Sequence, residues 1–368
     1  METAKPTKTF NFISILILYL DRGRCFVLRR TLNVPFILKI YSDRGKRVFV
    51  LSLLSMAISL MVSLIAPYIV IFIGPLIFGF PHLLATYLFL PRFFSKKINQ
   101  LPLLLGFTGD RHLVGFCLII SAIYKIFFEN ILTNQIKTFV PLVEIAVTSG
   151  AFFWLIKPAI FSRKTILGAC EQATFAAMVL IFPFESMTFL ILFHNFQAFL
   201  FWGIVAKENK HLLYPTLSSV IFIAINAFIG LGFFDHFHNH ISHILTPSFF
   251  SLPYQVVPTT LNSLYLTRVA IALAFGQGVH YFIWLKAIPD ELRVEPVPLT
   301  LRKSLGRLLK NSGPIAPIFM TAMMLALIAV ACFSPERART LYLCVASAHG
   351  FLELGVGFAI FNRLFISD

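Results

Sequence analysis

Four histidines lie within long apolar stretches of the chain, each separated from the next by more than sixty residues. They are His82, His194, His280 and His349. A polar side chain at membrane depth is costly, so it usually faces the interior of a helix bundle and marks a functional site. Neutral imidazole is also a favoured ligand of iron, copper and zinc. The four histidines therefore predict a shared transition-metal site.

Each of these histidines has a polar companion on the same or the next helical turn. Thr86 follows His82 by four residues, and Glu353 follows His349 by four. A metal-bound imidazole usually gives its second N–H to a carboxylate, an amide or a carbonyl. We expect two carboxylates to orient ligands or handle protons as the catalytic groups, and three amides to help bind the cofactor: Glu353 and Glu171, and Gln197, Gln277 and Asn195.

The composition requires that these residues be carried by membrane helices. Hydrophobic residues make up 58% of the 368 positions and charged residues 13%, with a mean hydropathy of +0.82. Ordinary soluble domains are about 25% charged. The predicted fold is an all-α, polytopic transmembrane bundle in a bacterial inner (plasma) membrane. Because about 20 apolar residues cross a bilayer, ten spans are predicted, at 48–66, 68–90, 111–128, 137–156, 165–182, 183–205, 213–234, 267–286, 314–333 and 340–362.

The distribution of basic residues orients this bundle. Lys and Arg cluster in the N-terminal segment and in alternate connections, which places both termini in the cytoplasm. We therefore expect the basic residues behind the net charge of +15 to contact membrane lipid, and we expect no nucleic acid as partner. Protein partners are left unknown. The four histidines fall on spans that run in the same direction, about 9–20 Å from the cytoplasmic ends at 1.5 Å per residue.

The chain divides into a basic interfacial segment, residues 1–47, and a single transmembrane domain, residues 48–368. This domain has a cytoplasmic loop at 287–312, in which the pattern of Leu299 to Lys310 predicts an amphipathic helix on the membrane surface, with a solvated connector as the alternative. It also has an outer loop at 235–266, rich in histidine. His236, His238, His240 and His243 could bind zinc or copper there, or form a solvated cluster without a role. In the second span, Pro75 and Pro81 predict a bend or a local unwinding of the helix near His82.

The segment Gly79-Phe80-Pro81-His82 resembles the Gly-x-Pro-His motif near the start of the Brp/Blh family, the membrane β-carotene dioxygenases of bacteria and archaea. This resemblance implies a helical membrane enzyme whose histidines, drawn from several helices, hold a non-haem iron. It implies that His82 is an iron ligand, with His194, His280 and His349 as candidates for the others. It also implies an Fe(II) cofactor and a lipid-soluble, carotenoid- or isoprenoid-like substrate.

Three other functions remain open at this point. The same histidines and Glu353 could titrate along the pathway of a proton- or metal-coupled transporter. A pair of them could hold a haem, or bind a quinone, in an electron-transfer protein. Each could also be an interhelical hydrogen-bonding contact in a membrane scaffold. A shared metal site requires the imidazole nitrogens to approach a common point, whereas separate packing contacts do not.

Overall fold

The computed structural model describes residues 12–95, 183–239, 263–295 and 298–334, with residues 174, 177, 178, 181, 337, 338, 341, 342, 346, 349, 350, 353 and 357. Within these residues every regular element is a helix. The elements are α1 (Phe12–Thr31), α2 (Pro35–Ser42), α3 (Arg44–Ile65), α4 (Pro67–Gly74), η1 (Pro75–Gly79), α5 (Phe80–Ser95), α10 (Pro183–Glu208), α11 (Leu213–Gly230), α13 (Ser263–Phe282), η5 (Ile283–Ala287), α14 (Ile288–Glu291), α15 (Leu301–Ser312) and α16 (Ile315–Phe333). The all-α prediction is confirmed for this part of the chain.

Five stretches of the described helices are long and apolar enough to cross a membrane. They are Arg44–Ile65, Val70–Phe89, Leu213–Gly230, Leu264–Glu291 and Ile315–Phe333. Each overlaps a predicted span, so the chain is a helical membrane protein. The predicted spans 111–128 and 137–156 and most of 165–182 lie outside the described residues. The ten-span topology, the sidedness and the division into segments 1–47 and 48–368 therefore stay predictions.

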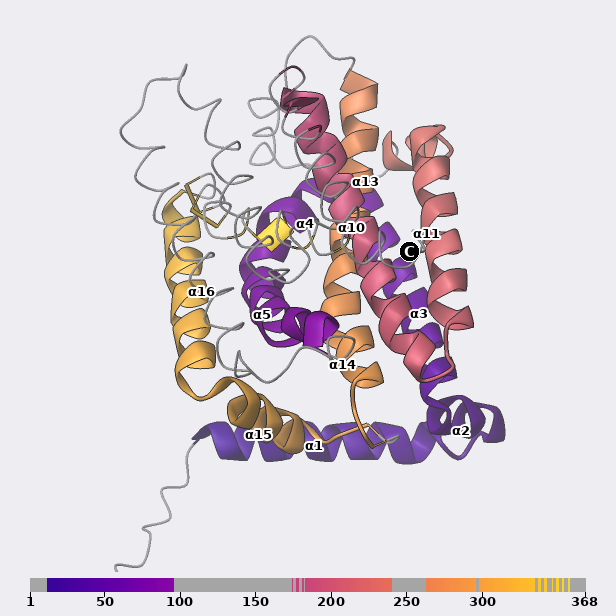
Figure 1. Cartoon of the computed structure of the whole chain (residues 1–368), viewed down its shortest axis with the longest axis vertical. Coiled ribbons are helices and arrows are strands. Elements are labelled where there is room, and N and C mark those ends of the chain that lie inside the picture. The colour runs from indigo at the N-terminus through magenta and orange to yellow at the C-terminus, as the bar shows by residue number, and fades with distance from the viewer. Residues whose placement is uncertain are drawn as a thin grey trace, which may run out of the picture.

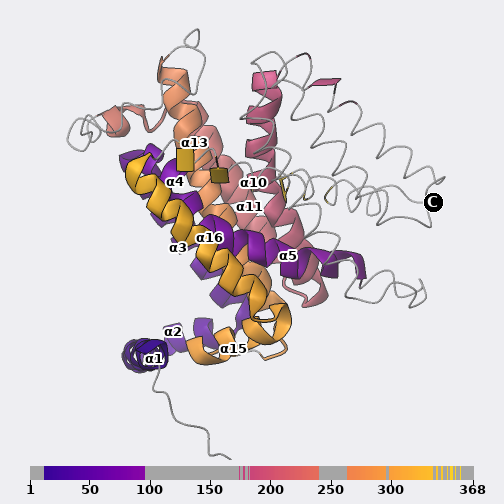
Figure 2. The same cartoon turned by 90° about the vertical axis from the view of Figure 1, so that its left-hand side faces the viewer.

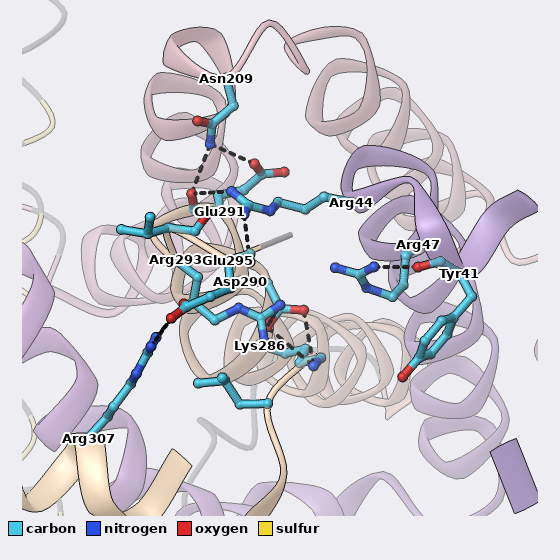
Figure 3. Close-up of polar contacts among 12 residues, drawn as sticks. Tyr41, Arg44, Arg47, Asn209, Lys286, Asp290, Glu291, Arg293, Glu295 and Arg307 are labelled. Atoms are coloured by element: carbon cyan, nitrogen blue, oxygen red, sulfur yellow. Dashed lines mark hydrogen bonds and ion pairs between the residues drawn. The ribbon is translucent and has the colours of Figure 1, made fainter. Parts of the chain in front are cut away.

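Contacts between the ends of helices show in which direction each helix runs through the bundle. Near the start of α3, Arg44 donates to the carbonyl of Glu291 at the end of α14, 3.2 Å away. Just after α10, the Asn209 amide donates to the Glu291 carboxylate at 2.9 Å. Figure 3 shows these contacts converging. At the other end, Arg268 pairs with Asp235. Hence α10 and α13 run in the same direction, while α3 and α11 run in the opposite one (Figure 1).

Helices α1 and α15 lie side by side across one end of the bundle, which we call the basic end (Figures 1 and 2). Asp21 of α1 accepts hydrogen bonds from the backbone N–H groups of Leu301 and Arg302, at 2.8 and 3.2 Å. A carboxylate at this place satisfies the free N–H groups of the first turn of α15. The helix predicted at 299–310 is thus confirmed as α15; that it lies on a membrane surface remains a prediction.

Two π-helical segments interrupt the helices that carry His82 and His280. Pro81 has no N–H for the carbonyl of Ile77, which lies within η1, and Pro289 likewise has none for Leu285, which lies within η5. Because a proline ring also crowds the carbonyl four residues earlier, the helix widens at both places; the N–H of Ile288 bonds the carbonyl of Ile283 instead. The local unwinding predicted near His82 is confirmed, as a π-segment in an otherwise continuous helix.

Two apolar clusters surround the region where His82 lies. The larger includes Phe201, Trp202, Phe275 and Trp284, all fully buried among α10, α13 and η5. The smaller joins Leu76, Phe80 and Leu83 to Leu327 of α16 and to Tyr342. Because Leu83 belongs to one cluster and Ala85 to the other, His82 stands at the junction between them and is held away from water.

Candidate metal centre

The four predicted histidines come together inside the bundle. One ring nitrogen from each of His82, His194, His280 and His349 lies within 4.8 Å of the others. His82 follows η1, His280 precedes η5, His194 lies in the middle of α10, and His349 lies in a helical turn near the C-terminus. His82, His280 and His349 are buried and His194 is half-buried. Four imidazoles so arranged could hold a metal ion.

His82 is at the centre of the group. Its Nε2 atom lies 3.1 Å from Nε2 of His349 and 3.1 Å from Nε2 of His280. Two ligands of a tetrahedral ion with metal–nitrogen bonds of about 2.0 Å lie about 3.3 Å apart. The observed separations are therefore close to those of ligands that share one ion.

The protons of these rings can be assigned in part from their partners. Nδ1 of His349 contacts the carbonyl oxygen of Ala346, so its proton is on Nδ1 and its Nε2 carries a lone pair. If Nε2 of His82 is protonated, it can donate to His349, but it then has no lone pair for His280. If it is unprotonated, its lone pair faces the lone pair on Nε2 of His349. With neutral rings, at least one of the two 3.1 Å contacts therefore cannot be a hydrogen bond. A cation would accept the lone pairs of all three Nε2 atoms.

Glu353 borders the histidine group, as its position four residues after His349 predicts. The side chain is completely buried. Its Oε1 atom accepts a hydrogen bond from Thr86 at 2.9 Å, and its Oε2 atom lies 3.4 Å from Nδ1 of His194. A carboxylate beside Nδ1 favours a proton there and leaves Nε2 of the same ring as the ligand atom. Thr86, the predicted companion of His82, in fact holds Glu353.

The three amides predicted to bind a cofactor have different surroundings. The Gln197 side chain contacts the backbone carbonyl of Glu353, which ties α10 to the helical turn that carries Glu353. Gln277 donates to the Tyr281 hydroxyl at 2.8 Å. Asn195 is buried against Gly276 of α13, where an added Cβ would lie 2.8 Å from the Asn195 amide nitrogen. Their role in binding a cofactor remains a prediction.

Two predicted sites fall wholly or partly outside the described residues. Glu171 is not among them, and neither are His240 and His243 of the outer cluster. Of the remaining pair, His236 is exposed, whereas His238 is buried and donates from Nδ1 to the carbonyl of Leu64 at 2.8 Å. His238 thus fastens the segment after α11 to the end of α3.

Two aromatic residues that the sequence analysis did not select pack on His82. The ring centroids of Trp284 and Tyr281 both lie 5.7 Å from that of His82. Trp284 stands four residues after His280, so helical spacing could have pointed to it. The two rings shield the imidazoles from water and fix the orientation of His82.

No family model, curated protein or solved structure matches this chain. The resemblance carried by Gly79 to His82 therefore stays a hypothesis. What the chain shows without it is a helical membrane protein with a buried group of four histidines that could hold a metal ion.

Proposed function

We propose that the four histidines bind Fe(II) and that the protein is a non-haem iron oxygenase of a lipid-soluble, carotenoid- or isoprenoid-like substrate. The observation that carries this proposal is the meeting of three Nε2 atoms at His82, with both separations at 3.1 Å. Four imidazoles suit iron, and an iron ion so held would supply O₂ activation at a coordination position that they leave open. Both atoms of O₂ can be added across a carbon–carbon double bond without an external reductant.

The separations argue against a haem held between two of these histidines. Imidazole nitrogens on opposite faces of a haem iron lie about 4 Å apart, twice a bond of about 2.0 Å, with the porphyrin between the rings. The Nε2 atoms of His82 and His349 are closer than that. Moreover, the ring centroids of His194 and His280 are only 4.4 Å apart. A single ion fits this group better than a macrocycle does.

An apolar groove supports access from the lipid. Its volume is about 470 Å³, and it lies between α3, the α4–η1 segment and α13. Its walls include Leu54, Ile58 and Ile77, which are exposed and would face acyl chains. Tyr281 forms part of its inner wall, with its ring against that of His82. A hydrophobic molecule could therefore approach the histidines from within the bilayer, separated from them by one side chain.

The amino acids of this chain then have three tasks. The imidazoles hold the ion, and Glu353 orients His194 through Nδ1. Trp284 and the other buried rings exclude water. Tyr281 and the groove hold the apolar substrate. Glu353 is the one carboxylate among the described residues that contacts the histidine group, and we assign it orientation of ligands and the handling of protons.

Oxygen consumption by iron-loaded protein tests this proposal. The full chain is purified without oxygen, loaded with Fe(II), placed in vesicles that contain a polyene hydrocarbon, and exposed to ¹⁸O₂. We expect carbonyl products that carry ¹⁸O. Replacement of Ser55, in the groove wall, by Trp should raise the KM without removing iron, whereas Val50→Trp on an exposed part of α3 should not. Bound iron without oxygen uptake would contradict the oxygenase, and Fe(II) flux into protein-containing vesicles would indicate a transporter.

A further inference from the structure

A second cavity lies at the basic end and shares no lining residue with the groove. Its volume is about 810 Å³, within the range of about 300–1,000 Å³ that is typical of ligand sites. It is enclosed by α5, by the η5–α14 end of α13, and by α1 and α15. Leu84 and Leu88 of α5 and Leu285 of η5 line its inner part, while Leu305 and Leu308 of α15 line it from the opposite side. It is therefore apolar where it enters the bundle.

Charged side chains line the same cavity, and positive charges are in excess. Four cations face two carboxylates: Arg24, Lys286, Arg293 and Arg307 against Asp21 and Asp290. The difference among the lining residues, four minus two, is a net charge of +2, and it falls to +1 when Glu295, the partner of Arg307 outside the lining, is counted. A cavity with an apolar wall and a cationic rim is complementary to a molecule with a hydrocarbon chain and an anionic head.

The carboxylates are already engaged by other groups. Asp21 accepts from the backbone at the start of α15. Asp290 is shared by Lys286 and Arg293, at 3.0 Å from each. One carboxylate therefore compensates two cations, and the charge of Asp21 is directed at a helix N-terminus. Arg24 uses one nitrogen to donate to the carbonyl of Leu299. Arg307 pairs with Glu295 (Figure 3), outside the cavity lining. A net positive charge is left at Arg24, Lys286 and Arg293.

The depth of the cavity matches the boundary between hydrocarbon and headgroups. Lys286 and Asp290 stand near the end of the candidate membrane span Leu264–Glu291, and Arg293 stands just beyond it. The apolar lining residues Leu84 and Leu88 lie within the span Val70–Phe89. Helices α1 and α15 cross the basic end below both (Figure 2). One molecule in this cavity would thus have its tail at span depth and its head at the level of α1.

We propose that this cavity binds one anionic phospholipid, with its phosphate near Arg24 and Arg293 and an acyl chain against Leu84, Leu88 and Leu285. The lipid would bridge α1 and α15 to the transmembrane helices. Its site is separate from the histidine group, because Pro81 and Trp284 line the cavity and stand between it and the imidazoles. The proposal therefore does not depend on which metal the histidines hold, or on whether they hold one.

Lipid binding by the purified full chain tests this directly. The protein, in a zwitterionic detergent, is titrated with spin-labelled phosphatidylglycerol, and the immobilised fraction is measured by electron paramagnetic resonance. We expect saturation at about one lipid per chain. Spin-labelled phosphatidylcholine should bind at least five-fold more weakly, since each basic side chain near an anionic headgroup contributes about a five-fold preference. Equal affinity for the two lipids would overturn the proposal.

Paired variants distinguish this cavity from the basic surface in general. Arg24→Gln should weaken binding of phosphatidylglycerol about five-fold, whereas Arg22→Gln, which removes the same charge from an exposed site of α1 outside the cavity, should leave it unchanged. Ala85→Trp, which fills the apolar part but keeps every charge, should abolish saturable binding. Equal effects of Arg24→Gln and Arg22→Gln would overturn the proposal.

A soluble competitor separates a lipid site from a phosphate site. Glycerol 3-phosphate at millimolar concentration should displace little of the spin-labelled lipid, because it lacks the acyl chain. Complete displacement would show a site for free phosphate and overturn the lipid proposal. Circular dichroism of each variant checks that its helices are intact. Should Ala85→Trp fail to fold, Leu88→Trp fills the same cavity from the next turn of α5.

Discussion

The basic end and the candidate metal centre both bury polar side chains in the same bundle. They differ in the partners that these side chains have. At the basic end, anions face donors: Glu291 meets Asn209 and His211, and Asp290 meets two cations. At the centre, imidazole nitrogens face one another around His82. Buried polar groups are stable when they are paired. The comparison shows that the carboxylates of the basic end are paired within the chain, whereas the imidazoles of the centre face one another in an arrangement that could hold a cation.

The largest difference between the two regions is expected when one imidazole is removed from each and the bound metal is measured. His82→Ala takes away the nitrogen shared by two 3.1 Å contacts, so we expect bound transition metal to fall from about one equivalent to under about a tenth. His211→Gln, the matched change at the basic end, keeps a polar partner for Glu291 and should leave the metal content unchanged. Elemental analysis of purified protein measures both. Full metal content in His82→Ala would show that the ion, if present, is held elsewhere.

Loss of the hydroxyl that holds Glu353 should have the next largest effect. Thr86→Val keeps the shape of the side chain but removes the 2.9 Å hydrogen bond to Oε1, so the carboxylate is less well fixed beside His194. We expect metal affinity to fall about 10–100-fold, as for other groups that orient metal ligands. Competition with a chelator measures this. Thr216→Val, which removes an exposed hydroxyl from α11, is the control, and an equal loss of affinity in both variants would refute the role of Glu353.

A change at the basic end should affect stability and leave the centre intact. Asn209→Ala removes the donor of two hydrogen bonds to Glu291, at 2.8 and 2.9 Å, and leaves a buried carboxylate less well paired. We expect the free energy of unfolding to fall by about 1–3 kcal/mol, measured by denaturant titration in micelles, with metal affinity unchanged. Asn226→Ala removes an amide within α11 and should cost less. Weaker metal binding in Asn209→Ala would contradict the claim that the basic end does not contribute to the metal centre.

The smallest effect is expected from pH at the edge of the basic end. Arg307 lowers the pKa of Glu295 to about 2 by hydrogen bonding and by its charge. A lowered carboxyl pKa stabilises the folded protein above the unfolded value of 4.5, and this contribution is lost as pH falls towards 2. The difference in melting temperature between the native protein and Glu295→Gln should thus be constant from pH 6 to 8 and shrink below pH 4.5. A difference that grows in acid would contradict the pairing.

The sequence was sufficient to predict the five described membrane helices and to select the four histidines as candidates for one site. The apolar runs around His82 and His280 predict membrane helices, because length and hydropathy decide whether a helix can cross a bilayer. The spacing of His349 and Glu353 predicts one shared helical face. The meeting itself needed coordinates, since it depends on how four separate helices pack.

Other features were beyond the reach of sequence patterns. Pro81 indicated a distortion near His82, but the π-segment after His280 was missed, although Pro289 carries the same physical signal. Thr86 was assigned to His82 by spacing, but its hydroxyl donates to Glu353, which is 267 positions away in the sequence and is brought to it only by helix packing. The cavity at the basic end depends on α1 and α15 packing together, which no local pattern encodes.

X-ray absorption spectroscopy of the iron-loaded protein, purified without oxygen, tests the central claim most directly. The account predicts about one iron per chain in a shell of nitrogen ligands at about 2.0–2.3 Å, with the outer-shell scattering of several imidazoles. It also predicts that this scattering is lost in His82→Ala. A shell of oxygen or sulfur atoms without imidazole scattering, or iron below a tenth of an equivalent after loading, would contradict it.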